Sequence, residues 1–142
     1  MYLEDFKLQM EIEIPPASVM KQKMVDFAKD YDPFPFHYDE AYAEKTQFGG
    51  LIAPGVMSFM TVWEKFVEIN PFGDELVAGK STKIEWFKAV FPGDILYGKA
   101  RVTGIQPRND YNGIVEITIE VHNQNGDLVL SDVTETIVKR RR

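Results

Sequence analysis

Two different spacings of apolar side chains follow one another in the N-terminal part of the chain. Residues 7–14 place an apolar side chain at every second position, which predicts a half-buried strand that ends at Pro15 and Pro16. Apolar residues then recur at steps of three and four over residues 19–31. This second spacing predicts an amphipathic helix with Ser18 as its N-cap, and we expect its apolar stripe to pack in the core.

The middle of the chain contains two further helical segments separated by a pair of glycines. Residues 39–45 are expected to form a short helix capped by Asp39. Residues 55–69 are apolar on almost every side, which predicts a long helix at the centre of the core. Pro54 suits the start of this helix because a missing N–H in the first turn breaks no hydrogen bond.

The C-terminal half is predicted to form strands. Four segments are rich in strand-forming residues: 78–90, 95–105, 114–121 and 128–138. Turn sequences at residues 92–94 and 125–127 separate neighbouring segments, which favours an antiparallel meander. With the N-terminal strand, these segments predict a single α+β domain over residues 1–142, in which a curved antiparallel sheet of about five strands wraps around the long central helix.

Composition places the chain among globular proteins that build their own core. Of its 142 residues, 44% are hydrophobic and 27% are charged, which excludes collagen-like and broadly disordered classes. The formal net charge is −6, and such a field repels nucleic acid, so we expect no nucleic-acid partner. The only basic run, residues 139–142, is expected to be a solvated, frayed tail that could still meet a ligand phosphate.

Membrane association and thiol chemistry are both disfavoured. No segment approaches the ~18 apolar residues of a membrane span, and the acidic start does not resemble a secretory signal. We therefore expect a cytoplasmic protein without a membrane partner. The absence of cysteine removes thiolate metal sites and cysteine nucleophiles, which leaves chemistry based on oxygen and imidazole.

One acid and one imidazole are candidates for moving protons. His37 lies five positions after Asp32, and a carboxylate with an imidazole is a common general acid–base pair near neutral pH. Five extended residues span roughly 17 Å, so the side chains meet only if Pro33 and Pro35 bend the loop back. Alternatively, Asp32 only ends the first helix and His37 hydrogen-bonds a backbone carbonyl. Spacing alone favours this structural alternative.

A glycine-rich approach to the long helix is a second, independent candidate. Residues 49–55 run into the helix N-terminus, where free N–H groups and the helix dipole can hold an oxyanion. Gly55, at the helix start, would contribute the first of these N–H groups. The alternative is that the glycines only let the loop pass close to the sheet.

Other kinds of site receive little support. A metal site formed by His37, Asp39 and Glu40 is disfavoured because carboxylates at a helix start are expected for the helix dipole, and we expect no metal. No serine-hydrolase elbow, Walker A loop, dinucleotide fingerprint or zincin motif occurs. Because these motifs are absent, general acid–base catalysis is the kind of chemistry that the sequence favours.

Three segments in order resemble the MaoC-like hydratases and dehydratases, a hotdog-fold family that includes the (R)-specific enoyl-CoA hydratases. Residues 27–40 are similar to the family's hydratase segment, which has an Asp, a proline-containing stretch and a His five positions later. Residues 46–55 are similar to its approach to the central helix, and residues 87–96 to its characteristic turn between strands. The resemblance therefore implies a hotdog fold.

In that family the Asp and His activate the water that adds across a 2-enoyl thioester, and a backbone N–H at the helix start holds the thioester oxygen. The resemblance thus implies catalytic roles for Asp32, His37 and Gly55. It also implies four substrate-binding residues: Phe34, Ile52, Ala53 and Pro54. Two of these depart from the family's pattern, because Phe34 stands where many members have Asn, and Pro54 where His or Ser is common. The departures bear on the identity of the substrate more than on the reaction.

The resemblance implies a hydro-lyase that hydrates trans-2-enoyl thioesters, with coenzyme A as the thiol, to 3-hydroxyacyl thioesters, or catalyses the reverse dehydration. It also implies a homodimer or higher homo-oligomer, and a reaction that needs no metal or redox cofactor. Lys88, Arg101 and the basic run at residues 139–142 are candidates for binding the coenzyme A phosphates. The alternatives are a hotdog acyl-CoA thioesterase and a non-catalytic acyl-CoA-binding or assembly subunit.

Overall fold

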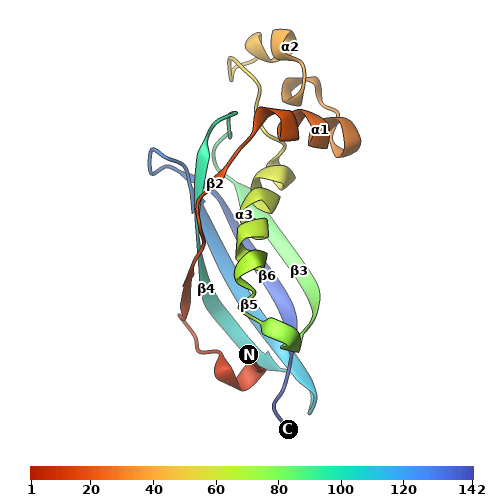
Figure 1. Ribbon diagram of the computed structural model, residues 1–142, viewed down its shortest axis with the longest axis vertical. Coiled ribbons are helices and arrows are strands. Elements are labelled where there is room, and N and C mark those ends of the chain that lie inside the picture. Colours follow the sequence, from red (N-terminus) through yellow and green to blue (C-terminus); the bar gives the residue numbers. More distant parts are fainter.

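A curved antiparallel sheet holds one long helix against its concave face in the computed structural model, which describes all 142 residues (Figure 1). The strands are β1 (Glu11–Glu13), β2 (Ala17–Ser18), β3 (Leu76–Trp86), β4 (Ile95–Pro107), β5 (Asn112–His122) and β6 (Leu128–Lys139). They follow the order β1-β4-β5-β6-β3, every pair is antiparallel, and β2 pairs with the beginning of β4. The predicted α+β architecture is confirmed.

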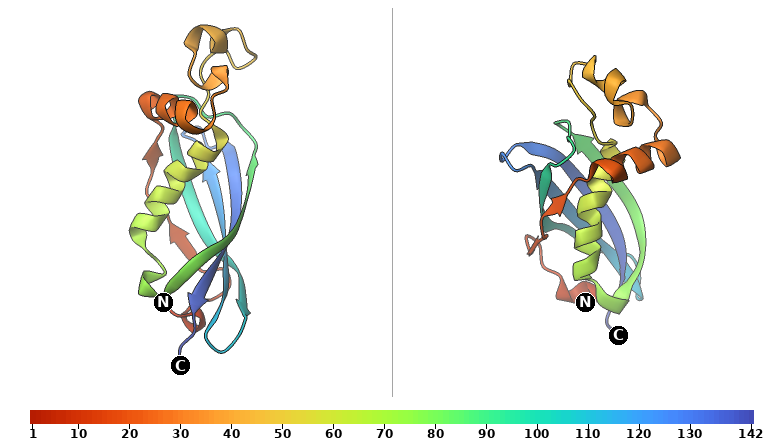
Figure 2. Two further views of the ribbon diagram at one scale, coloured as in Figure 1. Left: turned by 90° about the vertical axis from the view of Figure 1, so that its right-hand side faces the viewer. Right: turned by 45° about the horizontal axis from the view of Figure 1, so that its top comes forward.

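The helices divide between the concave face and one end of the sheet. The long helix α3 (Gly55–Ile69) crosses the concave face, whereas α1 (Lys21–Tyr31) and α2 (Glu40–Glu44) lie beyond the end of the sheet where α3 begins (Figure 1, Figure 2). Single 3₁₀ turns form η1 (Leu3–Asp5), η2 (Pro35–His37) and η3 (Gly73–Glu75). Asp39 caps α2 as predicted, because its Oδ1 accepts from Tyr42 N–H (3.1 Å). None of the helices is both long enough and apolar enough to span a membrane.

The core lies between the sheet and α3. Four alternate residues of β5 are fully buried, which confirms the alternation predicted for residues 114–121: Val115, Ile117, Ile119 and Val121. Val62 and Phe66 of α3 pack against them in the same cluster. The long helix is nevertheless not buried on every side as predicted, since four of its apolar residues are 41–52% exposed: Val56, Met60, Val67 and Ile69.

The connection from β3 to β4 differs from the predicted meander. β4, β5 and β6 do follow one another, and Gly126 (φ 79°) lies in the tight turn that joins β5 to β6. β3, however, pairs with β6 at the far side of the sheet. Residues 92–94 therefore do not join paired strands, and the chain instead crosses the end of the sheet. A turn sequence specifies a local bend but not which strand lies beside which.

The N-terminal strand is shorter than predicted. Gln9 adopts a left-handed conformation (φ 70°), although its N–H still donates to Val102 O of β4 (2.8 Å). This kink confines regular pairing to β1 and leaves Leu8 60% exposed. The alternation of apolar residues thus extends further than the strand itself.

The predicted N-cap at Ser18 is wrong. Ser18 lies in β2 opposite Ile95, and α1 begins at Lys21 without a side-chain cap. The backbone bonding to β4 continues one residue further, because Val19 N–H donates to Asp94 O (2.9 Å). Pairing with the sheet satisfies backbone groups that a helix beginning at Ser18 would have to satisfy elsewhere.

The basic run at residues 139–142 is not frayed. Arg140 Nε donates to Glu4 (3.1 Å), and Arg141 Nη2 donates to both carboxylate oxygens of Asp5 (2.8 and 2.9 Å). The run is therefore fastened to η1, at the end of the sheet opposite α1 and α2 (Figure 1). The pattern of the run itself did not indicate this, since its acidic partners lie 136 residues earlier in the chain.

Candidate active site

His37 is positioned by a loop that turns back after α1. Asp32 N–H donates to Ala28 O (2.9 Å) and closes the last turn of that helix. Pro35 then occupies the start of η2, where its restricted φ favours the turn and its missing N–H breaks no bond. The turn carries the His37 side chain into the protein, where it is 6% exposed, compared with 32% for Asp32.

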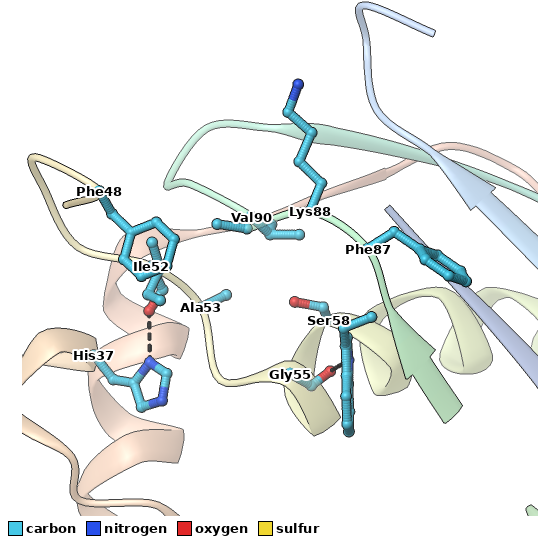
Figure 3. A pocket seen from close by; sticks show the side chains of 11 residues that line it. His37, Phe48, Ile52, Ala53, Gly55, Ser58, Phe87, Lys88 and Val90 are labelled. Carbon is cyan, nitrogen blue, oxygen red and sulfur yellow. Dashed lines mark hydrogen bonds between the residues drawn. The ribbon is translucent and has the colours of Figure 1, made fainter. Parts of the chain in front are cut away.

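Asp32 and His37 face each other across a short gap. Asp32 Oδ2 is 3.4 Å from His37 Nε2, and the other ring nitrogen, Nδ1, is 2.7 Å from Ile52 O (Figure 3). A carbonyl oxygen only accepts, so Nδ1 carries the proton, and in the neutral imidazole Nε2 directs a lone pair toward the carboxylate. The structure thus contains both arrangements considered from sequence, the acid–imidazole pair and the bond to a backbone carbonyl.

This arrangement directs two hydrogen-bond acceptors at the same space. The Asp32 carboxylate and the unprotonated His37 Nε2 have no proton to share between them. A water molecule that donates one O–H to each would satisfy both groups. Such a water has its oxygen lone pairs free for attack on an electrophile and lies beside two groups that can take its proton.

The segment before α3 brings the helix start to the same region. Ile52 N–H donates to Phe36 O (3.2 Å), and Ala53 N–H donates to Val90 O (2.8 Å). Gly55, the first residue of α3, donates its N–H to no acceptor in the chain. Unpaired N–H groups and the helix dipole make this end of α3 electropositive, which suits an oxygen that gains negative charge during a reaction.

Glycine at position 55 is required by the indole of Trp86. Trp86 Nε1–H donates to Gly55 O (2.9 Å). A Cβ at position 55 would lie only 2.6 Å from Trp86 Cε2, which is far closer than two non-bonded carbon atoms approach each other. The absence of a side chain therefore allows the indole to pack directly on the first turn of α3.

An open cavity of about 340 Å³ lies beside His37 and the first turn of α3 (Figure 3). Its lining comprises His37, Phe48, Ile52, Ala53, Gly55, Ser58, Trp86, Phe87, Lys88, Ala89 and Val90. Seven of these eleven residues are hydrophobic, which is typical of a pocket that binds an apolar group with a few polar anchors. Asp32 lines a neighbouring hollow of about 440 Å³ with Phe27, Tyr31 and Val56, so the Asp32–His37 pair stands between two openings.

The resemblance also implied a buried imidazole paired with a carboxylate and an open helix end beside the imidazole, and comparison with known proteins tests that resemblance. The family model described as "MaoC like domain" matches residues 5–125. The chain belongs to this MaoC-like family. Family membership supports hydratase or dehydratase activity in general.

Full-length relatives of this MaoC-like chain agree with the assignment. The uncharacterized protein YdeM of Bacillus subtilis (strain 168) is 28% identical over 141 residues, which cover 99% of this chain and 100% of the relative. The monoamine oxidase regulatory protein from Archaeoglobus fulgidus superposes with a TM-score of 0.95 at 27% identity, covering 100% of this chain and 96% of the other. The MaoC-like dehydratase from Rhodospirillum rubrum gives 0.88 at 29% identity, covering 100% and 99%. The predicted hotdog fold is confirmed.

The four predicted substrate-binding residues of the MaoC-like chain divide into two pairs. Ile52 and Ala53 line the cavity. Phe34 does not, because its ring stacks on Phe36 (centroids 5.5 Å apart, planes 7° apart) and is 59% exposed. Pro54 does not line it either, and its carbonyl oxygen accepts from Ser58 N–H (3.0 Å).

Only Lys88 among the predicted phosphate-binding cations lies at the cavity. Its Nζ donates to Asp127 (2.6 Å), and this contact lowers the pKa of the Asp127 carboxyl. Arg101 projects from the outer face of the sheet into a polar hollow with Glu11 and Glu120, away from α3. The basic run at residues 139–142 is held at the opposite end of the sheet.

Sequence reasoning missed six residues that line the cavity: Phe48, Ser58, Trp86, Phe87, Ala89 and Val90. Ser58 carried a usable signal, because it stands between Met57 and Phe59 in the apolar first part of the long helix, and the structure shows it almost fully buried. Trp86 carried none, since its contact with Gly55 depends on how β3 lies against α3. No group of three His, Asp or Glu side chains is arranged to hold a metal ion.

Proposed function

We propose that this MaoC-like protein catalyses the reversible hydration of trans-2-enoyl thioesters of coenzyme A to 3-hydroxyacyl thioesters. One observation carries the proposal. Asp32 Oδ2 lies 3.4 Å from Nε2 of His37, and His37 lines the same cavity as Gly55, whose N–H is unpaired. Family membership and the likeness to the dehydratase from Rhodospirillum rubrum support the class of reaction.

The proposed steps balance without a co-reactant. The water held by Asp32 and His37 adds its oxygen to C3 of the enoyl group and gives one proton to this pair. The electrons of the C2–C3 double bond move toward the thioester, whose oxygen gains negative charge opposite Gly55 N–H. C2 then takes the proton from the pair, so one water has been added and both side chains have returned to their starting states.

Lys88 is the cation that we assign to the coenzyme A phosphates. Coenzyme A is an anion and the chain has a net charge of −6, so a local cation is needed to hold it. Lys88 lies at the cavity, and its side chain points away from His37 and Gly55 toward the surface (Figure 3). A phosphate at this position would take the place of Asp127 as the partner of the ammonium group.

We also propose a homodimer in which β3 pairs with β3 of a second copy. β3 is an edge strand, and ten of its eleven residues are exposed. Unpaired backbone groups along such an edge favour pairing with another strand. The exposed apolar residues Val56, Met60 and Val67 of α3 add apolar surface that a second copy can cover. Light scattering of the purified protein is expected to give twice the chain mass of 16.3 kDa.

Crotonyl-CoA distinguishes the proposed reaction from the two alternatives. Hydration lowers the absorbance of the conjugated enone without releasing free thiol, and this is the expected result. A thioesterase releases free thiol, and a non-catalytic binding subunit changes neither signal. Either of these last two outcomes, with folded protein, would contradict the proposed hydration.

A further inference from the structure

We propose that Trp86 closes the acyl-binding space beside Gly55 and restricts this protein to short-chain 2-enoyl thioesters. The inference rests on the proposed hydration, because it places the thioester oxygen at Gly55 N–H. It adds the class of acyl group that the site accepts.

Two places where α3 and β3 lie side by side define a seam along which an acyl chain can extend. At the first level, Gly55 O accepts from Trp86 Nε1–H (2.9 Å). At a later level, Trp63 of α3 and Thr82 of β3 both line a second cavity, of about 470 Å³. Eight residues of α-helix separate Gly55 from Trp63, which corresponds to about 12 Å along the axis. The two cavities thus lie at successive levels of one seam.

The Trp86 indole lies at the first level, where it packs on Gly55. It lines the first cavity and is absent from the lining of the second. Alternate residues of a strand share a face, so Thr82 and Ile84 project from the same face of β3 as Trp86. Going from Gly55 toward the second cavity, an acyl chain meets Trp86 first and Ile84 next.

The indole is held in this position by two contacts with Gly55. Its N–H donates to Gly55 O, and its ring lies so close to Gly55 that a methyl group at position 55 would overlap it. Moving the ring aside breaks the hydrogen bond and leaves the first turn of α3 without its neighbour. A three- or four-carbon 2-enoyl group is short enough to end at the indole, whereas a longer chain that extends toward the second cavity collides with it.

Chain-length selectivity of matched variants tests this inference. The ratio of kcat/KM for 2-octenoyl-CoA to kcat/KM for crotonyl-CoA is measured within each variant, so a loss of active protein cancels. We expect the wild type to favour crotonyl-CoA by about tenfold or more, which is the scale on which a pocket of limited size discriminates. Trp86→Ala is expected to shift the ratio toward octenoyl-CoA by about tenfold or more.

Trp86→Phe separates the bulk of the ring from its hydrogen bond. Phe keeps most of the bulk but cannot donate to Gly55 O, so this variant is expected to retain the wild-type preference for crotonyl-CoA. A shift as large as that of Trp86→Ala would assign the selectivity to the hydrogen bond and overturn the inference. Trp86→Leu provides an intermediate size if the alanine variant does not fold.

Failure of the inference is distinguishable from failure of the proposed function. An active wild type that hydrates octenoyl-CoA as well as crotonyl-CoA would overturn the chain-length restriction and leave hydration intact. The same holds for an active Trp86→Ala variant with an unchanged ratio. A folded wild type that hydrates neither ester would overturn both proposals.

Discussion

At the scale of single residues, the site depends on which nitrogen of His37 carries the proton. Ile52 O holds that proton on Nδ1, which leaves Nε2 free to act as a base toward a water shared with Asp32. His37→Asn removes Nε2, while its side-chain amide can still donate to Ile52 O. We expect this variant to lose about 10²- to 10⁴-fold in crotonyl-CoA turnover while its thermal unfolding stays close to that of the wild type.

Two further substitutions control for the effect of His37→Asn. His37→Ala also leaves Ile52 O without a donor, so it should unfold more easily, by about 1–3 kcal/mol. Asp32→Asn should lose activity like His37→Asn, whereas Asp30→Asn, which changes an exposed carboxylate in the last turn of α1, should not. Wild-type turnover in both His37→Asn and Asp32→Asn would refute the acid–base assignment.

Gly55 is a residue whose replacement acts through one neighbour. The new Cβ of Gly55→Ala would overlap the Trp86 ring, so we expect a loss of about 1–3 kcal/mol in unfolding free energy through overpacking. Removing the ring at the same time, in Gly55→Ala with Trp86→Ala, should make the alanine at position 55 much less costly. Urea unfolding of the two single variants and the double variant measures this coupling, and strictly additive effects would show that the overlap is not the cause.

At the scale of elements, β6 places the carboxyl group of Asp132 in the apolar interior. Thr82 Oγ1 contacts both Asp132 Oδ1 and Thr134 Oγ1 (2.8 Å), and Thr134 Oγ1 contacts Asp132 Oδ2 (2.5 Å). These three contacts need three hydrogens, but the two hydroxyls supply two. A protonated Asp132 supplies the third. Burial, which is complete at this residue, raises the pKa of the Asp132 carboxyl and agrees with this count, although the two hydroxyls oppose it.

The raised pKa of Asp132 predicts a pH dependence of stability. Because the folded state holds this proton more tightly than the unfolded chain, stability falls as the pH rises from the ordinary carboxyl pKa through the raised folded value. Asp132→Asn keeps a donor and an acceptor in the same shape but does not titrate. We expect the difference in unfolding free energy between this variant and the wild type, measured in urea, to move in favour of the variant as the pH rises above about 4. Parallel pH profiles for the two proteins would show that Asp132 is ionised throughout.

Elements differ in how far local sequence determines them. The apolar run of α3 and the alternation of β5 predicted both elements, because each pattern reflects burial against one neighbour. The spacing of Asp32 and His37 permitted a pair but favoured the structural alternative, so their pairing was an expectation from the resemblance. The position of β3 beside β6, the contact of Trp86 with Gly55 and the bond from Ala53 to Val90 could not be predicted. Each of these three contacts joins segments that are far apart in the sequence, so no pattern within one segment predicts it.

At the scale of the whole molecule, the two ends of the chain are joined by charge. The backbone N–H of Arg141 and the side chain of Arg140 lower the pKa of Glu4, and the Tyr2 N–H and the Arg141 side chain lower that of Asp5. A carboxylate with a lowered folded pKa adds stability above its ordinary pKa and loses it as the pH falls through the folded value. The joined ends should therefore stabilise the fold at neutral pH and not in acid.

Replacing both arginines tests this coupling of the chain ends. Arg140→Ala with Arg141→Ala is expected to lower the thermal midpoint at about pH 7, and the difference from the wild type should shrink toward about pH 3, as the pH falls through the lowered pKa values of Glu4 and Asp5. Added salt should shrink the difference at neutral pH, because the contacts are exposed. Lys99→Ala removes another exposed cation, but one paired with Glu11 and Glu13 on the sheet surface, so it controls for the loss of positive charge alone. Equal effects of the double variant at both pH values would mean that the arginines act through packing rather than through their carboxylate partners.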